Sequence, residues 1–166
     1  MATSFSLVTN WLTLEMDNSL KNVLAIACGI VNGKKFGDNA RAALITRGLA
    51  EMVRLGLAKG AKFETMMGLS GLGDLTLTCN GAQSRNMSLG MALGEGRQLS
   101  NILGERRSVA EGVDTSRSMS ALAEGLGVEM PICDAINRIL HQNENVDDVI
   151  RTLLRRPFRA ENPKLN

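Results

Sequence analysis

The sequence predicts an all-α fold, and three observations support this prediction. Apolar residues recur at three- and four-residue steps in several long segments, which is typical of amphipathic helices. Glycine, proline or a short polar residue stands at the ends of most of these segments. Alternation with a period of two, typical of strands, occurs only at residues 6–14 and 75–78, and the first of these is a candidate for a short strand.

The first two predicted helices contain the longest apolar patterns. One spans residues 20–31, follows a short polar capping residue among 17–19 and ends at Gly33. The other spans residues 39–59 and ends at Gly60. Short polar side chains accept hydrogen bonds from the first helical turn, and glycine lets the chain leave a helix at low cost.

The next segment is rich in glycine. Residues 63–67 can form one or two helical turns, but 68–73 cannot continue a regular α-helix at low cost, because each glycine costs roughly 1 kcal/mol there. We expect a loop whose backbone passes close to another group and leaves Asp74 at the start of a short helix. Gly71-Leu-Gly73 is not a dinucleotide fingerprint, because that motif needs a preceding strand, a third glycine and a βαβ unit.

Four further helices are predicted from apolar periodicity. Ser84 is a plausible N-cap for the first of them, and Pro131 opens the third. They span residues 84–93, 111–126, 132–141 and 146–154.

Composition excludes several classes of function. The 166 residues carry a net charge of +2 and only 3% aromatic residues, which argues against nucleic-acid binding. Three dispersed cysteines and one histidine lack the spacing of a metal site, so we expect no metal and three reduced, buried thiols. The longest apolar run, 23–31, is far shorter than the roughly 18 residues of a membrane span. We therefore expect a cytoplasmic protein.

Two groups of residues could carry chemistry. Ser84-Arg85-Asn86 combines a capping hydroxyl, a guanidinium and the first N–H groups of a helix, an arrangement that suits phosphate. A solvated surface arginine is an equally good interpretation of the spacing alone. For Lys21 the residues by themselves favour a side chain that extends to water over a proton donor in a closed cleft.

Together these segments resemble bacterial NAD(P)-dependent glycerol-3-phosphate dehydrogenases, in the family's order and at its spacing. The resemblance rests on Leu20-Lys21-Asn22-Val23, the run 39–52, the block 71–79, Ser84-Arg85-Asn86 and Ala110-Glu111-Gly112. It implies the multi-helix C-terminal domain of the 6-phosphogluconate-dehydrogenase-like type. We expect that substrate-binding and catalytic domain at 14–156, after a poorly matched segment at 1–13 and before a polar tail at 157–166.

The resemblance also implies an activity, the interconversion of dihydroxyacetone phosphate and sn-glycerol 3-phosphate with NAD or NADP, for glycerophospholipid synthesis. Lys21 matches the catalytic lysine, and Asp74 matches a carboxylate that binds substrate and holds that lysine. The other matches are the substrate contacts Asn22, Thr78, Ser84, Arg85 and Asn86, and the cofactor contacts Arg85, Val109 and Glu111.

Two departures from the family leave alternatives open. The sequence contains no strand–Gly-x-Gly-x-x-Gly–helix unit, so no Rossmann domain is expected in this chain, and most of the cofactor site would lie on a separate Rossmann half. Asp17-Asn18-Ser19 replaces the family's Gly-Gly-Ala, which could block the site. The chain could instead be a non-catalytic helical remnant that dimerises or binds a phosphate ester.

Two expectations concern the surface. The apolar face that the other domain normally covers should promote association, so we expect a homodimer. Four arginines near the end of the chain could bind a membrane surface, but they only reach the threshold for lipid recognition and are more typical of a solvated end. They are Arg151, Arg155, Arg156 and Arg159.

Overall fold

The computed structural model describes residues 2–81, 84–105 and 110–155, and every regular element within these ranges is helical. This result confirms the all-α prediction. The elements are α1 (Ala2–Gly33), α2 (Asp38–Ala58), α3 (Phe63–Met67), the π-helical turn η1 (Leu69–Gly73), α4 (Asp74–Asn80), α5 (Arg85–Gly94), α6 (Leu99–Gly104), α7 (Glu111–Gly125), α8 (Pro131–His141) and α9 (Val146–Leu154).

Local geometry confirms most of the predicted helix ends. Gly60 and Gly127 adopt φ angles of +84° and +64°, the left-handed conformation in which the chain leaves α2 and α7. The Ser84 hydroxyl accepts a hydrogen bond from the Met87 amide at 3.3 Å and caps α5. Capping depends on atoms within a few residues of the helix end, which is why sequence signals suffice to locate it.

Two local predictions are wrong, and α6 was not predicted. Residues 6–14 are helical rather than a strand, and no helix begins at 17–19, because α1 runs without a break from Ala2 to Gly33. Residues that favour strands cost a helix at most about 0.7 kcal/mol each. Continuation of an existing helix adds a hydrogen bond with each residue and outweighs this preference.

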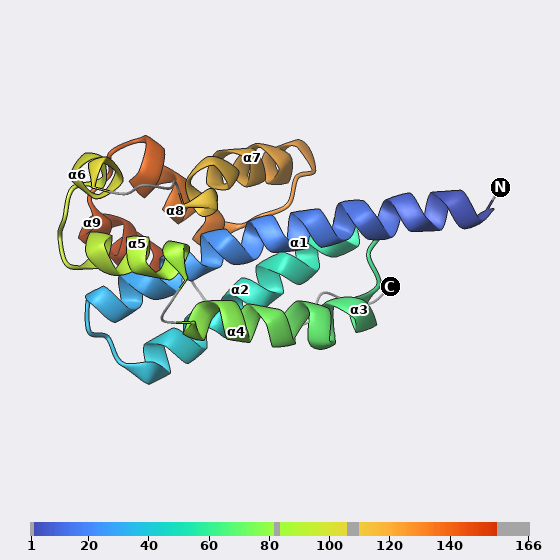
Figure 1. The fold of residues 1–166 in the computed structure, drawn as a ribbon, viewed down its shortest axis with the longest axis horizontal. Helices are drawn as coiled ribbons and strands as arrows, with labels where there is room; N and C mark the ends of the chain where they lie inside the picture. The colour runs from blue at the N-terminus through green and yellow to red at the C-terminus, as the bar shows by residue number, and fades with distance from the viewer. Residues whose placement is uncertain (1, 82–83, 106–109, 156–166) are drawn as a thin grey trace.

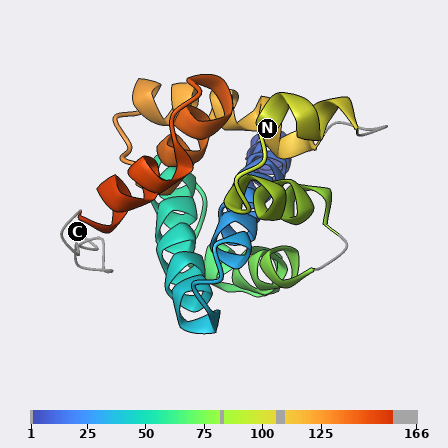
Figure 2. The ribbon, with the colours of Figure 1, turned by 90° about the vertical axis from the view of Figure 1, so that its left-hand side faces the viewer.

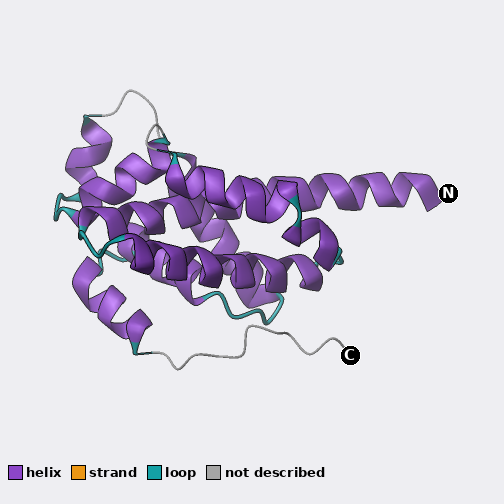
Figure 3. Ribbon diagram, turned by 90° about the horizontal axis from the view of Figure 1, so that it is seen from below, coloured by secondary structure: helices purple, strands orange, loops and turns teal. Residues whose placement is uncertain are grey.

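α1 is the central helix of the bundle (Figure 1). It contacts α5, α7 and α8 as well as α2 and α4, and the view along the bundle shows these helices arranged around it (Figure 2). The first turns of α1 extend beyond the other helices (Figures 1 and 3). Among the described helices, none has the length and apolar character needed to span a membrane.

α1 and α5 pack backbone against backbone through four glycines, Gly29, Gly33, Gly90 and Gly94, which we call the glycine seam. A Cβ atom on Gly90 would lie 2.0 Å from the Ile26 carbonyl oxygen, and one on Gly29 would lie 2.2 Å from the Met87 carbonyl oxygen. No side chain other than hydrogen fits at such distances. The contacts pair Ile26 with Gly90 and then, one turn later, Ile30 with Gly94, so the two helices run parallel with a constant register.

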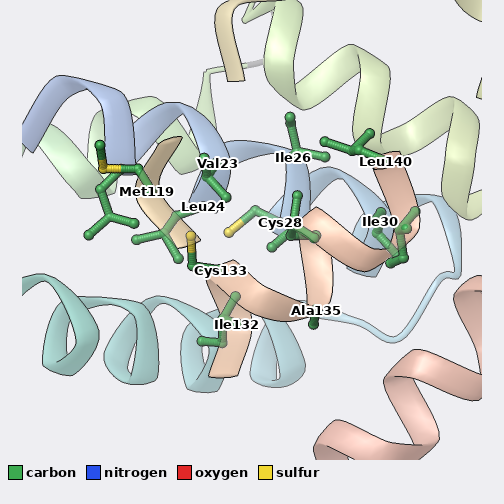
Figure 4. Packing of buried hydrophobic residues seen from close by; sticks show 14 of the residues in the cluster. Val23, Leu24, Ile26, Cys28, Ile30, Met119, Ile132, Cys133, Ala135 and Leu140 are labelled. Atoms are coloured by element: carbon green, nitrogen blue, oxygen red, sulfur yellow. The ribbon is translucent and has the colours of Figure 1, made fainter. Parts of the chain in front are cut away.

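The main core lies where α1, α7 and α8 meet. Figure 4 shows Leu24 and Cys28 of α1 beside Ile132 and Cys133 of α8, and all four are buried. Cys28, Cys79 and Cys133 are free and buried, as expected. A hydrogen bond with Cys79, together with burial, raises the pKa of the Cys28 thiol, and burial raises the pKa of Cys133 to about 12. Both thiols are therefore neutral in the folded protein.

A buried carboxylate joins α2 to the start of α8. Glu51 is 1% exposed, and its two oxygens accept hydrogen bonds from the backbone amides of Ile132 at 2.7 Å and Cys133 at 3.2 Å. The N-cap residue Met130 makes no side-chain cap bond, so Glu51 satisfies these amides from another helix. The positive end of the α8 dipole favours the charge at this place.

Candidate functional site

Lys21 lies on α1, where its side chain is buried and its ammonium is paired with a carboxylate. The residue is 3% exposed, and its ammonium nitrogen donates to Asp74 Oδ2 and to the Ser70 carbonyl oxygen, both at 2.7 Å. The Asp74 side chain is 47% exposed. The ion pair therefore has one buried and one solvent-facing partner. This geometry rules out the interpretation of Lys21 as a side chain extended to water.

The π-helical turn η1 creates this geometry. A Cβ atom on Gly71 would lie 1.9 Å from the Met66 carbonyl oxygen, so only glycine allows the turn to fold against the end of α3. The wider turn aims the Ser70 carbonyl at Lys21. It starts α4 at Asp74, as the sequence predicted, but residues 69–73 are π-helical rather than the loop that was expected. Gly71-Leu-Gly73 is thus a close-packed turn between helices and not a nucleotide loop.

Asn22 and Asn86 continue the register of the glycine seam one turn before Ile26 and Gly90. The Asn86 amide nitrogen donates to Asn22 Oδ1 at 2.9 Å. Its oxygen accepts from the backbone amide of Gly112 at 3.0 Å. Asn86 is 7% exposed, so this side chain is a buried connector of α1, α5 and α7.

Arg85 and Glu111 occupy the first positions of α5 and α7. The guanidinium Nη2 of Arg85 lies 3.5 Å from Glu111 Oε1, and Glu111 Oε2 accepts from the Asn22 amide at 3.2 Å. Both charged side chains are largely exposed, at 56% and 66%. The first turn of α5 contains no acidic residue, so an arginine faces the positive end of the helix dipole.

The remaining predicted site residues flank this group. Thr78 lies one turn after Asp74 on α4, and its hydroxyl donates to the Asp74 carbonyl oxygen at 2.8 Å. Ser84 caps α5 beside Arg85. Val109 lies outside the described residues.

Hydrogen bonds connect the predicted site residues of four helices. Lys21 and Asp74 join α1 to α4, while Asn22, Asn86 and Glu111 join α1 to α5 and α7. Sequence reasoning missed the Ser70 carbonyl and the Gly112 amide, because a backbone group has no signature in the sequence. Gly112 did carry a signal in the sequence, because it is a glycine near a helix start. The structure explains it: a Cβ atom at this position would lie 2.9 Å from Asn86 Oδ1.

A pocket lies away from these residues, between α7 and α8. It is lined by Arg117, Asp134, Asn137 and their neighbours, and none of the predicted site residues lines it. Within the described part of the chain, no group of three or more histidine, cysteine, aspartate or glutamate side chains could hold a metal ion.

Comparison with known proteins identifies the family. Residues 10–151 match the family described as the NAD-dependent glycerol-3-phosphate dehydrogenase C-terminus. The glycerol-3-phosphate dehydrogenase [NAD(P)+] of Parvibaculum lavamentivorans is 63% identical over 147 residues, which cover 89% of this chain and 44% of that relative. The corresponding protein of Rhodospirillum rubrum is 60% identical over 147 residues and is covered to 42%.

A solved structure shows the same fold. The crystal structure of glycerol-3-phosphate dehydrogenase from Coxiella burnetii superposes with a TM-score of 0.82 at 46% identity, covering 87% of this chain and 44% of that one. The chain thus spans less than half the length of these relatives. The part of the relatives that it matches is their C-terminal domain. On these grounds the chain belongs to the C-terminal domain family of the NAD(P)-dependent glycerol-3-phosphate dehydrogenases.

Proposed function

We propose that this chain supplies the substrate-binding and catalytic half of a glycerol-3-phosphate dehydrogenase, which interconverts dihydroxyacetone phosphate and sn-glycerol 3-phosphate in the cytoplasm for glycerophospholipid synthesis. The observation that carries the proposal is the buried Lys21 ammonium, held by Asp74 and Ser70, with the neighbouring Asn22 bonded to Asn86. Family membership supports the assignment.

Lys21 is the proton donor in this proposal. A bound nicotinamide cofactor would supply the hydride for the carbonyl carbon. Lys21 would give a proton from its ammonium to the carbonyl oxygen, and would take that proton back in the reverse reaction. A positioned general acid contributes about 10²–10⁴ in rate. Asp74 holds the ammonium in place, and its half-exposed carboxylate can also accept a hydrogen bond from a substrate hydroxyl. Asn22 and Thr78 flank the same position.

The phosphate end of the substrate would lie at the start of α5. Ser84, Arg85 and Asn86 are consecutive there, and the first backbone N–H groups of a helix favour an anion. Hydrogen bonds to a charged group contribute about 1.5–3 kcal/mol each. Only the Arg85 side chain is largely exposed, so it is the residue best placed to reach a ligand phosphate.

In this proposal the chain contributes only a few side chains to the binding site for NAD or NADP. Arg85 and Glu111 present exposed side chains at two helix N-termini, which suit the phosphates and hydroxyls of a dinucleotide. No strand occurs in the described ranges, so the βαβ unit that usually cradles a pyrophosphate is not formed by them. A Rossmann half, separate or covalently joined, would supply the rest.

An apolar surface beside the site supports such a partner. Leu69 is 91% exposed, and Leu77, two turns further along the same face, is 73% exposed. Gly73 lies between these two leucines in the sequence, and the Leu69 side chain packs over it. Asp74 is the next residue, so the apolar surface adjoins the site. Without a Rossmann half, this surface would favour a homodimer. Leu69→Lys with Leu77→Lys should then shift the chain to monomer in sedimentation velocity, whereas Phe36→Lys, at another exposed apolar residue, should not.

The proposal is tested with the nucleotide-binding half of the Parvibaculum relative. We expect the mixture to oxidise NAD(P)H with dihydroxyacetone phosphate, and the chain alone to show little turnover, because hydride transfer requires cofactor and carbonyl in near-attack geometry. Lys21→Met should abolish turnover in the mixture, while Lys62→Met, at an exposed lysine, should leave it unchanged.

The competing proposal is a non-catalytic remnant that binds a phosphate ester. Asp17-Asn18-Ser19 favours it, since these residues lie on α1 just before Lys21 and are larger than the Gly-Gly-Ala of the family that they replace. A mixture that binds sn-glycerol 3-phosphate but gives the same background rate with and without Lys21 would support the remnant and overturn the enzyme.

A further inference from the structure

The Glu111 carboxylate contacts two side chains of the proposed substrate site. One of its oxygens accepts a hydrogen bond from the Asn22 amide at 3.2 Å, and the other lies 3.5 Å from Arg85 Nη2. The proposed function assigns Arg85 to the substrate phosphate and Asn22 to the neighbouring part of the same substrate. The chain thus places an anion of its own where the ligand anion is expected.

The position of Glu111 follows from the packing of its neighbour. The Gly112 amide donates to Asn86 Oδ1 at 3.0 Å, and both residues are buried. Gly112 fits so closely that a Cβ atom would lie 2.7 Å from Ile26 Cδ1 and 2.9 Å from the Asn22 carbonyl oxygen. The backbone at the start of α7 is therefore held against α1 and α5, and Glu111 is held within reach of Arg85.

The Glu111 side chain itself is free to move. It is 66% exposed, and Arg85 is 56% exposed, so the carboxylate can rotate into water without breaking a buried contact. Exposed ion pairs contribute only about 0–1 kcal/mol. A phosphate ester carries about −1.5 to −2 charges at neutral pH and three acceptor oxygens, more than one carboxylate can offer to the same donors.

We propose that Glu111 is an internal competitor for the phosphate ester, a carboxylate that occupies the Arg85 and Asn22 donors in the ligand-free protein and is displaced when the ester binds. This inference rests on the proposed function, because it concerns the same anion site. The contact keeps the two donors oriented toward the site and raises the ligand concentration needed to fill it.

The test is a titration of the isotope-labelled 166-residue chain with sn-glycerol 3-phosphate, followed by amide NMR at constant ionic strength. Glu111→Gln keeps the size of the side chain and removes its charge, and we expect it to lower the dissociation constant about two- to fivefold, as suits an exposed contact. Glu111→Ala should act in the same direction. Asp114→Asn is the matched control, because Asp114 also lies exposed in the first turn of α7, whereas the partner of Arg85 and Asn22 is Glu111.

The same substitution in the Arg85→Ala variant distinguishes competition for Arg85 from a general electrostatic effect of removing a negative charge. With Arg85→Ala, the gain from Glu111→Gln should disappear, because the donor for which carboxylate and phosphate compete is gone. Melting curves of each variant show whether it is folded, and glycerol without phosphate should not shift the same amides.

Each outcome has a distinct meaning. Equal or weaker binding by Glu111→Gln, an equal gain in Asp114→Asn, or a gain that persists with Arg85→Ala would overturn the competitor while leaving the site in place. Absence of ester binding near Asn22 and Asn86 in the wild type and in both Glu111 variants would overturn the proposed substrate site itself, and the competitor with it.

Discussion

Two adjacent segments of α1 contact the rest of the molecule in different ways. From Ile26 to Gly33 the glycine seam brings backbone against backbone and leaves no room for a methyl group. One turn earlier, Lys21 and Asn22 reach α4, α5 and α7 through side-chain hydrogen bonds to Asp74, Asn86 and Glu111. The difference teaches that the seam sets the positions of the helices, while the polar segment carries the chemistry. Stability and function should therefore respond to different substitutions along one helix.

The largest effect should come from the seam. Gly90→Ala places a methyl group 2.0 Å from the Ile26 carbonyl oxygen, so the two helices must separate. We expect the free energy of unfolding to fall by roughly 3 kcal/mol, the upper end for overpacking, as measured by urea denaturation. Gly125→Ala, at a helical glycine with open space around it, should leave stability unchanged or raise it by up to about 1 kcal/mol. Equal midpoints for Gly90→Ala and wild type would contradict the close contact.

Glu51 extends the comparison to a buried charge with a structural role. Glu51→Ala leaves the Ile132 and Cys133 amides without their acceptor, at a cost of about 1–3 kcal/mol for such a buried group. Glu51→Gln keeps one carbonyl acceptor and should lose about half as much. The exposed Glu124→Ala should change the midpoint by less than about 0.5 kcal/mol. If both Glu51 variants matched this control, the cross-helix cap would contribute nothing.

Cys133 adds a dependence on pH to the same core. Its pKa is about 12 in the folded protein, against 9.0 for an unperturbed thiol, so between these values the unfolded chain loses a proton that the folded chain keeps. This contribution to stability is complete below pH 9 and is lost as pH rises toward 12, at no more than about 1.4 kcal/mol per pH unit. Cys133→Ala should show a shallower decline than wild type across this window in urea titrations. Parallel curves would count against a buried neutral thiol.

The smallest effect on stability should come from the polar segment. Lys21→Met removes a buried ammonium whose partner Asp74 is half-exposed and can be hydrated by solvent, so we expect the free energy of unfolding to change by less than about 1 kcal/mol in either direction. Lys59→Met, at an exposed lysine, provides the reference. A loss comparable to that of Gly90→Ala would show that Lys21 supports the fold as much as the seam does.

Sequence patterns correctly predicted those helix ends that are determined by atoms within a few residues. The starts of α5 and α8 follow from Ser84 and Pro131, and the ends of α2 and α7 from Gly60 and Gly127. The same reasoning failed at residues 6–14 and 17–19, where α1 continues through residues with weak helix preference. Propensities of a few tenths of a kcal/mol do not predict where a long helix begins.

The candidate site divides in the same way. By itself, the sequence determined the residue types, their order and their resemblance to a dehydrogenase family, because these depend only on the chain. Only the tertiary structure decided that Lys21 is enclosed, that the Ser70 carbonyl and the Gly112 amide belong to the site, and that Glu111 lies on Arg85. Burial and pairing depend on segments 26 to 89 residues apart, and the backbone contacts that bring them together, such as the seam, are made by atoms that every residue possesses.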